Sequence, residues 1–144
     1  MKTVGIGVQA AFVAAGGILG WFLGEPDGLL TTLIAFLAAD YLTGIMLAIL
    51  NKNLCSEIGF RGIFKKVMIF IIVGIAHLLD TQIFHDKSAF RTAVIFFYIS
   101  NEGISILENA SRLGLPVPKK LKEALRILHN KDKTVKAEKK EDDG

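Results

Sequence analysis

The sequence has little charge outside its last segment, and it has only one cysteine. Of the 31 Lys, Arg, Asp and Glu residues, 15 lie in residues 119–144 and only 16 in the 118 residues before them. A soluble domain of this length needs a wet face on every helix or strand, so this distribution argues against a soluble enzyme. The single Cys55 excludes an internal disulfide and a cysteine-based zinc or iron–sulfur site.

Motifs for catalysis and for nucleic-acid binding are also missing. The basic residues flank apolar runs and form no stripe interleaved with aromatic residues, which argues against nucleic-acid binding. We find no nucleophile with a base, no phosphate-binding glycine loop and no paired-carboxylate site. His77 and Asp80 can touch on a helix, but two ligands make a poor metal site, and a capping role for Asp80 is an equal alternative. We therefore expect no enzyme activity, cofactor or metal.

Long apolar runs are what the chain has instead. Its mean hydropathy is +0.45 and 51% of its residues are hydrophobic. Because a bilayer core of about 30 Å needs about 20 helical residues, these runs are long enough to span a membrane. We predict an all-α membrane protein whose transmembrane domain, residues 1–113, has four helices. They lie at about residues 3–24, 28–51, 64–84 and 89–107, and the fourth is amphipathic and the least apolar.

Polar segments separate these runs and follow the last of them. The turn at residues 25–28 predicts a hairpin of the first two helices, and a longer polar connection covers residues 51–66. Gly114 and Pro116 indicate a helix stop. Residues 114–130 are expected to be an amphipathic juxtamembrane segment, with a short helix after Pro118 at about Lys119 to His129. Residues 131–144 carry ten charges and are expected to be disordered.

The basic residues also predict the orientation in the membrane. Lys2, the connection after the second run and the segment after the fourth run are basic, whereas the first turn has no Lys or Arg. Four spans with both termini in the cytoplasm fit this alternation. A cleaved signal peptide at the first run is an alternative, but the run continues past Ala14–Gly16 without a polar cleavage region.

Polar residues inside the runs are the candidates for function. Asp40 lies in the middle of the second run, where a charge costs about 3 kcal/mol, so it should face protein or water together with Thr43 and Gly44. The fourth run has a polar stripe along one helical face, which is suited to lining a pore or contacting another subunit, or to lying flat in the membrane interface. The stripe consists of Tyr98, Asn101, Glu102, Ser105, Glu108, Asn109 and Arg112.

Two further groups of residues suggest contacts with other helices or with lipid. Gly16, Gly20 and Gly24 are spaced by four and make a flat helix face, which serves either self-association or packing within the chain. Arg61, Lys65 and Lys66 precede the third run and are expected to meet anionic headgroups at the membrane surface.

Several motifs in order resemble one known family. They are Asp40-Tyr41-Leu42-Thr43-Gly44, residues 52–56, Gly59–Ile63 with Lys65-Lys66, the stretch from Tyr98 to Asn109, and Leu113–Pro118. Together they resemble the phage lysis and toxin-secretion holins of Gram-positive bacteria and their phages, over about residues 30–128. The first run and the C-terminal tail have no counterpart in this resemblance.

The resemblance implies a protein that accumulates as homo-oligomers in the bacterial cytoplasmic membrane. At a set time such a protein permeabilises the membrane, releases an endolysin or a toxin and dissipates the proton-motive force. Two other interpretations stay open: a small four-helix drug or ion transporter, and a non-conducting scaffold or holin regulator. Transporters of that size use an acid in their first helix, which is absent here.

Overall fold

The computed structural model is entirely helical over the residues it describes, which are 2–85, 87–124, 126 and 127. The elements are α1 (Lys2–Leu23), α2 (Gly28–Leu50), α3 (Ser56–Leu78), the short π-helical segment η1 (Leu79–Phe84) and α4 (Ala89–Arg112). Residues 119–124, 126 and 127 are also helical and confirm a short helix after α4. The predicted tail, residues 131–144, lies outside the described residues.

Three of the long helices are long and apolar enough to cross a membrane. They are Thr3–Leu23, Gly28–Leu50 and the continuous stretch Ser56–Phe84. The fourth, α4, is as long but carries its polar residues along one face. The prediction of four long helices, with the last amphipathic, is therefore confirmed.

The third helix begins earlier than the sequence predicted. We expected a polar connection over residues 51–66 and a helix from residue 64, but α3 starts at Ser56 and the connection is confined to residues 51–55. Glu57 in the first turn favours a helix N-terminus, and a helix can carry Arg61 and Lys65 when their side chains stay exposed. Polarity alone therefore placed the boundary two turns too late.

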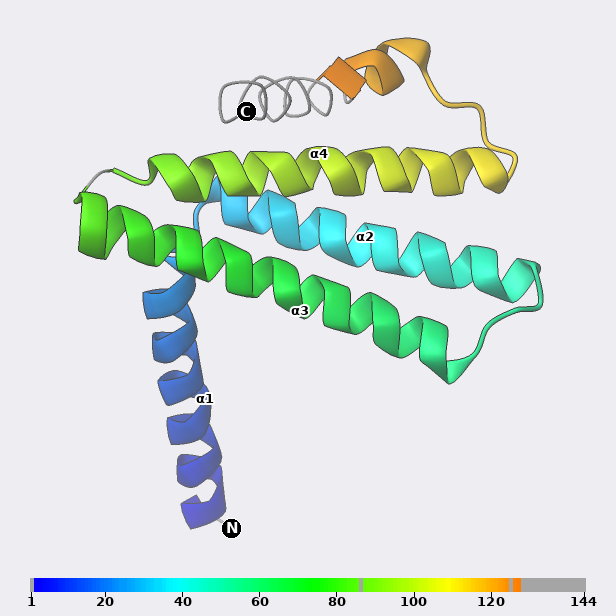
Figure 1. The fold of residues 1–144 in the computed structure, drawn as a ribbon. Coiled ribbons are helices and arrows are strands. Elements are labelled where there is room, and N and C mark those ends of the chain that lie inside the picture. Colours follow the sequence, from blue (N-terminus) through cyan, green and yellow to red (C-terminus); the bar gives the residue numbers. More distant parts are fainter. Residues whose placement is uncertain (1, 86, 125, 128–144) are drawn as a thin grey trace, which may run out of the picture.

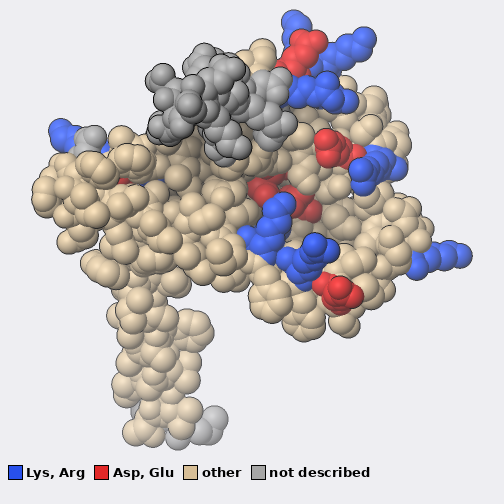
Figure 2. Space-filling model, viewed as in Figure 1, with Lys and Arg blue, Asp and Glu red and all other residues tan. Residues whose placement is uncertain are grey.

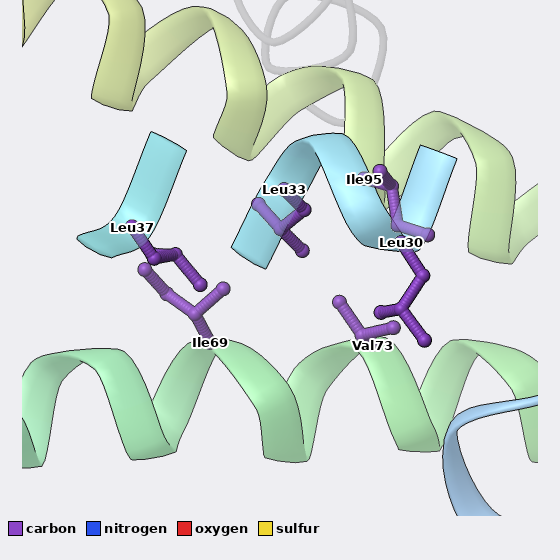
Figure 3. Packing of buried hydrophobic residues seen from close by; sticks show 6 residues of the cluster. All are labelled: Leu30, Leu33, Leu37, Ile69, Val73 and Ile95. Atoms are coloured by element: carbon purple, nitrogen blue, oxygen red, sulfur yellow. The ribbon is translucent and has the colours of Figure 1, made fainter. Parts of the chain in front are cut away.

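Helices α2, α3 and α4 pack side by side around a small apolar core (Figure 1). Figure 3 shows its members at helical spacing on α2 and α3, with one residue from α4 closing the cluster. Each helix packs into the core along one face only, so its other faces carry large apolar side chains that are exposed. The core residues are Leu30, Leu33, Leu37, Ile69, Val73 and Ile95.

Helix α1 projects away from the other three, so the predicted hairpin of the first two helices is wrong. Within the described residues α1 contacts α3 near its own C-terminal end and does not pack against α2 (Figure 1). Gly24 follows α1 in the left-handed conformation, with φ at 85°. The chain changes direction there, so α2 does not fold back along α1 as it would in a hairpin. From Thr3 to Leu23 the projecting helix has no acidic or basic residue, and the face seen in Figure 2 shows none along this stretch, so lipid or another chain must cover it.

The contact between α1 and α3 depends on a glycine. A Cβ atom at Gly74 would lie 2.1 Å from the ring of Phe22, so any side chain there must push this ring away. We expect Gly74→Ala to weaken α1 docking by about 1–3 kcal/mol, the usual cost of overpacking. The neighbouring Trp21, the sole tryptophan, lies beside Ile75 of α3. Because weaker docking of α1 separates the two residues, the quenching of Trp21 fluorescence by acrylamide should rise in Gly74→Ala.

A matched substitution and a double variant check this prediction. Gly17→Ala adds the same methyl group where no atom lies within 4 Å, so quenching should not change. In a Phe22→Ala background the Gly74→Ala substitution should have little further effect, because the clashing ring is gone. Equal quenching of Gly74→Ala and the parent protein would contradict the close packing described here.

Candidate functional site: an ion cluster between three helices

Three charged side chains from three helices meet inside the protein. The Lys66 Nζ atom on α3 donates to Asp40 Oδ2 on α2 at 2.8 Å and to Glu102 Oε2 on α4 at 2.7 Å. The Glu102 side chain is 2% exposed, whereas those of Asp40 and Lys66 are 14% and 13% exposed. We call these three residues the ion cluster.

The ion cluster carries two carboxylates and one ammonium group, so its formal charge is −1. Each charge would be expensive to leave alone in an apolar environment, and the short contacts offset that cost only while all three helices stay together. The cluster therefore couples the packing of α2, α3 and α4, and parting them exposes ionic groups.

Polar contacts continue from the ion cluster along α2 and α4. Asn109 Nδ2 donates to Thr43 Oγ1 at 3.0 Å, and the Ser105 side chain lies in hydrogen-bonding reach of Asp40. Gly44 lies beside Asn109, and a Cβ atom there would be in ordinary van der Waals contact with the amide nitrogen, at 4.0 Å. Five of the residues proposed from the two runs thus form one partly buried polar seam between α2 and α4, in which Glu102 is the most deeply buried. The five are Asp40, Thr43, Glu102, Ser105 and Asn109.

The remaining stripe residues are placed differently. Tyr98 packs against the apolar core, and Asn101 is half-buried. Glu108 is exposed and, with Arg112, lines a hollow of about 280 Å³ beneath the helix that follows α4. The stripe is one helical face in sequence, and Glu102, Ser105 and Asn109 in its middle and later turns make the polar contacts described above.

Lys66 is the residue that sequence reasoning placed wrongly. We grouped it with Arg61 and Lys65 as a membrane-surface cation, yet it is the shared partner of two carboxylates. Arg61 and Lys65 are exposed. Since Asp40 and Glu102 are the sole acids inside their runs, they call for a buried cation, and this was the signal that could have identified Lys66.

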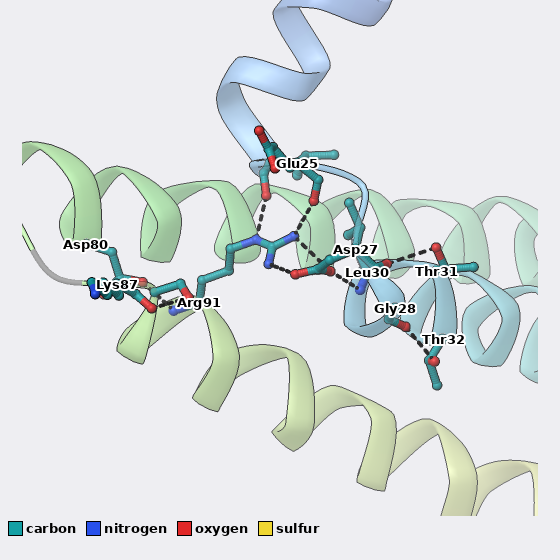
Figure 4. Close-up of polar contacts among 11 residues, drawn as sticks. Glu25, Asp27, Gly28, Leu30, Thr31, Thr32, Asp80, Lys87 and Arg91 are labelled. Atoms are coloured by element: carbon teal, nitrogen blue, oxygen red, sulfur yellow. Dashed lines mark hydrogen bonds and ion pairs between the residues drawn. The ribbon is translucent and has the colours of Figure 1, made fainter.

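A second polar cluster fixes the turn between α1 and α2 (Figure 4). Arg91 is 4% exposed, and its guanidinium donates to the backbone oxygen of Leu23 at 2.7 Å and that of Glu25 at 3.1 Å. It also donates to Asp27 Oδ2 at 2.7 Å. This hydrogen bond from Arg91 is the main reason why the pKa of Asp27 lies below its ordinary value.

Asp80 has a capping role rather than a ligand role. Its carboxylate accepts hydrogen bonds from the backbone N–H groups of Phe90 and Arg91 at 2.9 and 2.8 Å, at the start of α4. Ser88 precedes α4 but makes no side-chain cap, so Asp80 satisfies these N–H groups from the end of the preceding helix. Among the described residues no hydrogen bond or ion pair joins His77 to Asp80, and the His77 Nδ1 atom is buried without a hydrogen-bond partner.

The three glycines of the first run have two different environments. A Cβ atom at Gly16 or Gly20 would meet no atom of the described residues within 4 Å, so packing inside the chain does not explain them. Gly24 instead lies in the turn, where a Cβ atom would come within 2.9 Å of Arg91 Nε and 3.0 Å of His77.

In the described part of the chain no group of three or more His, Cys, Asp and Glu side chains is placed to hold a metal ion. The ion cluster makes helix separation in lipid costly, because each of its ionic groups is stable there only while it is paired with the others. Its chemistry is therefore that of a polar surface which the packed helices mostly cover, although Asp40, Lys66 and Asn109 also line a hollow of about 440 Å³.

Comparisons with known proteins identify the family of the chain. Residues 17–130 match the model of the bacteriophage holin family, whose members are non-enzymatic membrane proteins. An uncharacterized 14.9 kDa protein of Clostridium perfringens is 45% identical over 86% of this chain and 94% of its own length. An uncharacterized protein of Listeria monocytogenes is 45% identical over 81% of this chain and 82% of its own length.

One relative carries a functional name. A probable holin of Bacillus phage phi105 is 33% identical over 69% of this chain and 73% of its own length. No solved structure matches the chain. The family match covers all three members of the ion cluster and both members of the Asn109–Thr43 contact, and on this evidence the chain belongs to the bacteriophage holin family.

Proposed function

We propose that this holin-family protein oligomerises in the bacterial cytoplasmic membrane and forms lesions there. The lesions release an endolysin or a toxin and dissipate the proton-motive force. Both termini lie on the cytoplasmic side in this proposal, since the segments that would face the cytoplasm are the basic ones.

The observation that carries the proposal is the ion cluster in a protein made of lipid-compatible helices. A buried cluster of three ionic groups is weak evidence for stability, because apolar residues would hold the helices together as well or better. Charges retained inside a membrane protein favour a role in contact with water or ions. We therefore place Asp40, Glu102 and their polar neighbours in the lining of the open lesion.

Assembly would proceed by exchange of contacts. In the separate subunit, Lys66 neutralises most of the charge on the two acids, and α4 covers the polar seam. When subunits gather, α4 can move from α2 to face water while its apolar side stays in protein or lipid. Gly16 and Gly20 on the unpartnered α1 offer a face for contact between subunits, since the described chain leaves them uncovered.

Dye release from liposomes tests the lining. Each of Asp40→Leu and Glu102→Leu leaves Lys66 one carboxylate partner, so the helices keep an ion pair while the seam loses a charge. We expect each variant to slow the release of a large dye by at least about tenfold, the effect of about 1.4 kcal/mol. Normal release of large dyes by both variants would show the proposal to be wrong.

Controls separate the alternatives. Glu57→Leu removes an exposed acid at the start of α3 and should release dye as the parent protein does. A transporter would pass small ions without the large dye. A scaffold or regulator would do neither alone, and its expression with a cytoplasmic endolysin would not lyse a bacterium.

A further inference from the structure

A groove between α2 and α3 joins a basic end to an apolar end. Its basic end, a hollow of about 440 Å³, includes Arg61 and Lys65. Its apolar end, a hollow of about 310 Å³, is lined by Ile34, Val67 and Phe70 among others. Tyr41 and Lys66 line both hollows, so the two hollows lie next to each other with these residues between them. We call this the α2–α3 groove.

The basic end has two uncompensated positive charges. Asp40 also lines it, but its carboxylate is already paired with Lys66 at 2.8 Å. In the described part of the chain neither Arg61 nor Lys65 has a carboxylate within ion-pair distance, and both side chains are exposed. An anion with several oxygen acceptors therefore fits here, since Arg and Lys together suit a phosphate group.

The apolar end needs a cover of another kind. Ile34, Ile63 and Val67 are about half exposed, at 48%, 45% and 50%. An exposed apolar surface next to two cations suits an amphiphilic ligand, which has an anionic group at one end and an apolar chain at the other.

The depth of the groove in a membrane fits the same occupant. The 29 residues of Ser56–Phe84 make a helix of about 43 Å, longer than the bilayer core of about 30 Å. A helix of this length can extend its first turns into the headgroup region. In that position Arg61 lies among the headgroups, and Lys65 can reach them by extending its side chain towards water.

We infer that the α2–α3 groove binds one anionic phospholipid, with the phosphate between Arg61 and Lys65 and an acyl chain along Ile34, Val67 and Phe70. This is a site for a single lipid, distinct from the general attraction of basic residues to a membrane surface. It does not depend on lesion formation.

Native mass spectrometry of the full chain in detergent with equal phosphatidylglycerol and phosphatidylcholine tests the site. We expect one tightly held phosphatidylglycerol per chain, in preference to phosphatidylcholine. Arg61→Gln with Lys65→Gln should lower its occupancy by about fivefold for each charge removed. Lys52→Gln with Arg112→Gln removes two exposed charges outside the groove and should leave the occupancy unchanged. Equal losses in both double variants would show surface attraction only and overturn the site.

The apolar end has its own test. Ala38 lines it and is exposed, so Ala38→Phe should fill the groove and expel the lipid, whereas Ala35→Phe, exposed elsewhere on α2, should not. Unchanged lipid binding by Ala38→Phe would contradict the proposed acyl-chain position. Full displacement of the lipid by inorganic phosphate would mean a free-anion site. Loss of oligomers without loss of lipid in Ala38→Phe would mean that a second copy fills the groove. Either result would overturn the proposal.

Discussion

Replacing Lys66 by Met is expected to lower the free energy of unfolding by about 3–5 kcal/mol, because it leaves two carboxylates buried without their cation. The substituted side chain has nearly the same length, so the loss reports charge and not packing. Unfolding by SDS titration in mixed micelles measures the change. Protease access to the connection between η1 and α4 should rise with it, since α4 is then held less firmly.

Two comparison variants isolate the cause. Lys65→Met removes the neighbouring exposed cation and should change stability by less than about 0.5 kcal/mol. Lys66→Met combined with Asp40→Leu and Glu102→Leu removes every charge of the cluster and should recover most of the lost stability. This triple variant should fold and yet fail to release large dyes. A triple variant as unstable as Lys66→Met alone would contradict the account of the ion cluster.

Replacing Arg91 by Gln is expected to open the turn between α1 and α2. The guanidinium contacts two backbone oxygens and the Asp27 carboxylate, and its loss leaves the oxygens of Leu23 and Glu25 without this donor. Because Asp27 is partly exposed, we assign only about 2–3 kcal/mol to the set. Hydrogen exchange of the amides in residues 25–31 should therefore accelerate by about 30-fold or more.

Two controls accompany this prediction. Arg112→Gln removes an exposed arginine at the opposite end of α4 and should leave exchange in the turn unchanged. Arg91→Lys keeps the charge but lacks the planar fork that reaches three acceptor groups at once, so it should restore only part of the protection. Parent-like exchange in Arg91→Gln would show that the turn does not depend on this contact.

The number of helices and most of their ends could be predicted from the sequence. Apolar length located α1, which is free of charge from Thr3 onwards, and α2, whose one charge is Asp40, since hydropathy and helix rise determine what can span a bilayer. The start of α3 was missed because its first turns carry charges on an exposed face, which a search for uncharged runs rejects. The direction of α1 was missed because a short polar turn does not fix the angle between helices. Here Gly24 and the buried Arg91 set that angle.

The candidate site could be predicted in part. Asp40 and Glu102 stand out in sequence because ionisable residues in apolar runs are rare, and the helical spacing placed Asn109 on the face of Glu102. Lys66 is adjacent to other basic residues, and such a group resembles an ordinary membrane-surface flank. Only the crossing of α2, α3 and α4 shows which of the three cations turns inward. The role of Arg91 could not be predicted for the same reason, since its acceptors lie more than 60 residues away.

The central claim is that the packed helices hide a polar seam which the open lesion exposes to water. Accessibility of a thiol introduced by Ser105→Cys, in a Cys55→Ser background, tests it most directly in liposomes before and after dye release begins. Ser105 lies in the seam beside Asp40, and Cys55 is exposed and must be removed first. We predict that a membrane-impermeant reagent reacts slowly with the Ser105→Cys thiol before dye release and at least about tenfold faster afterwards. As a control, a thiol introduced by Phe96→Cys on the exposed apolar face of α4 should stay unreactive in both states. A Ser105→Cys thiol that reacts equally before and after release would contradict the claim.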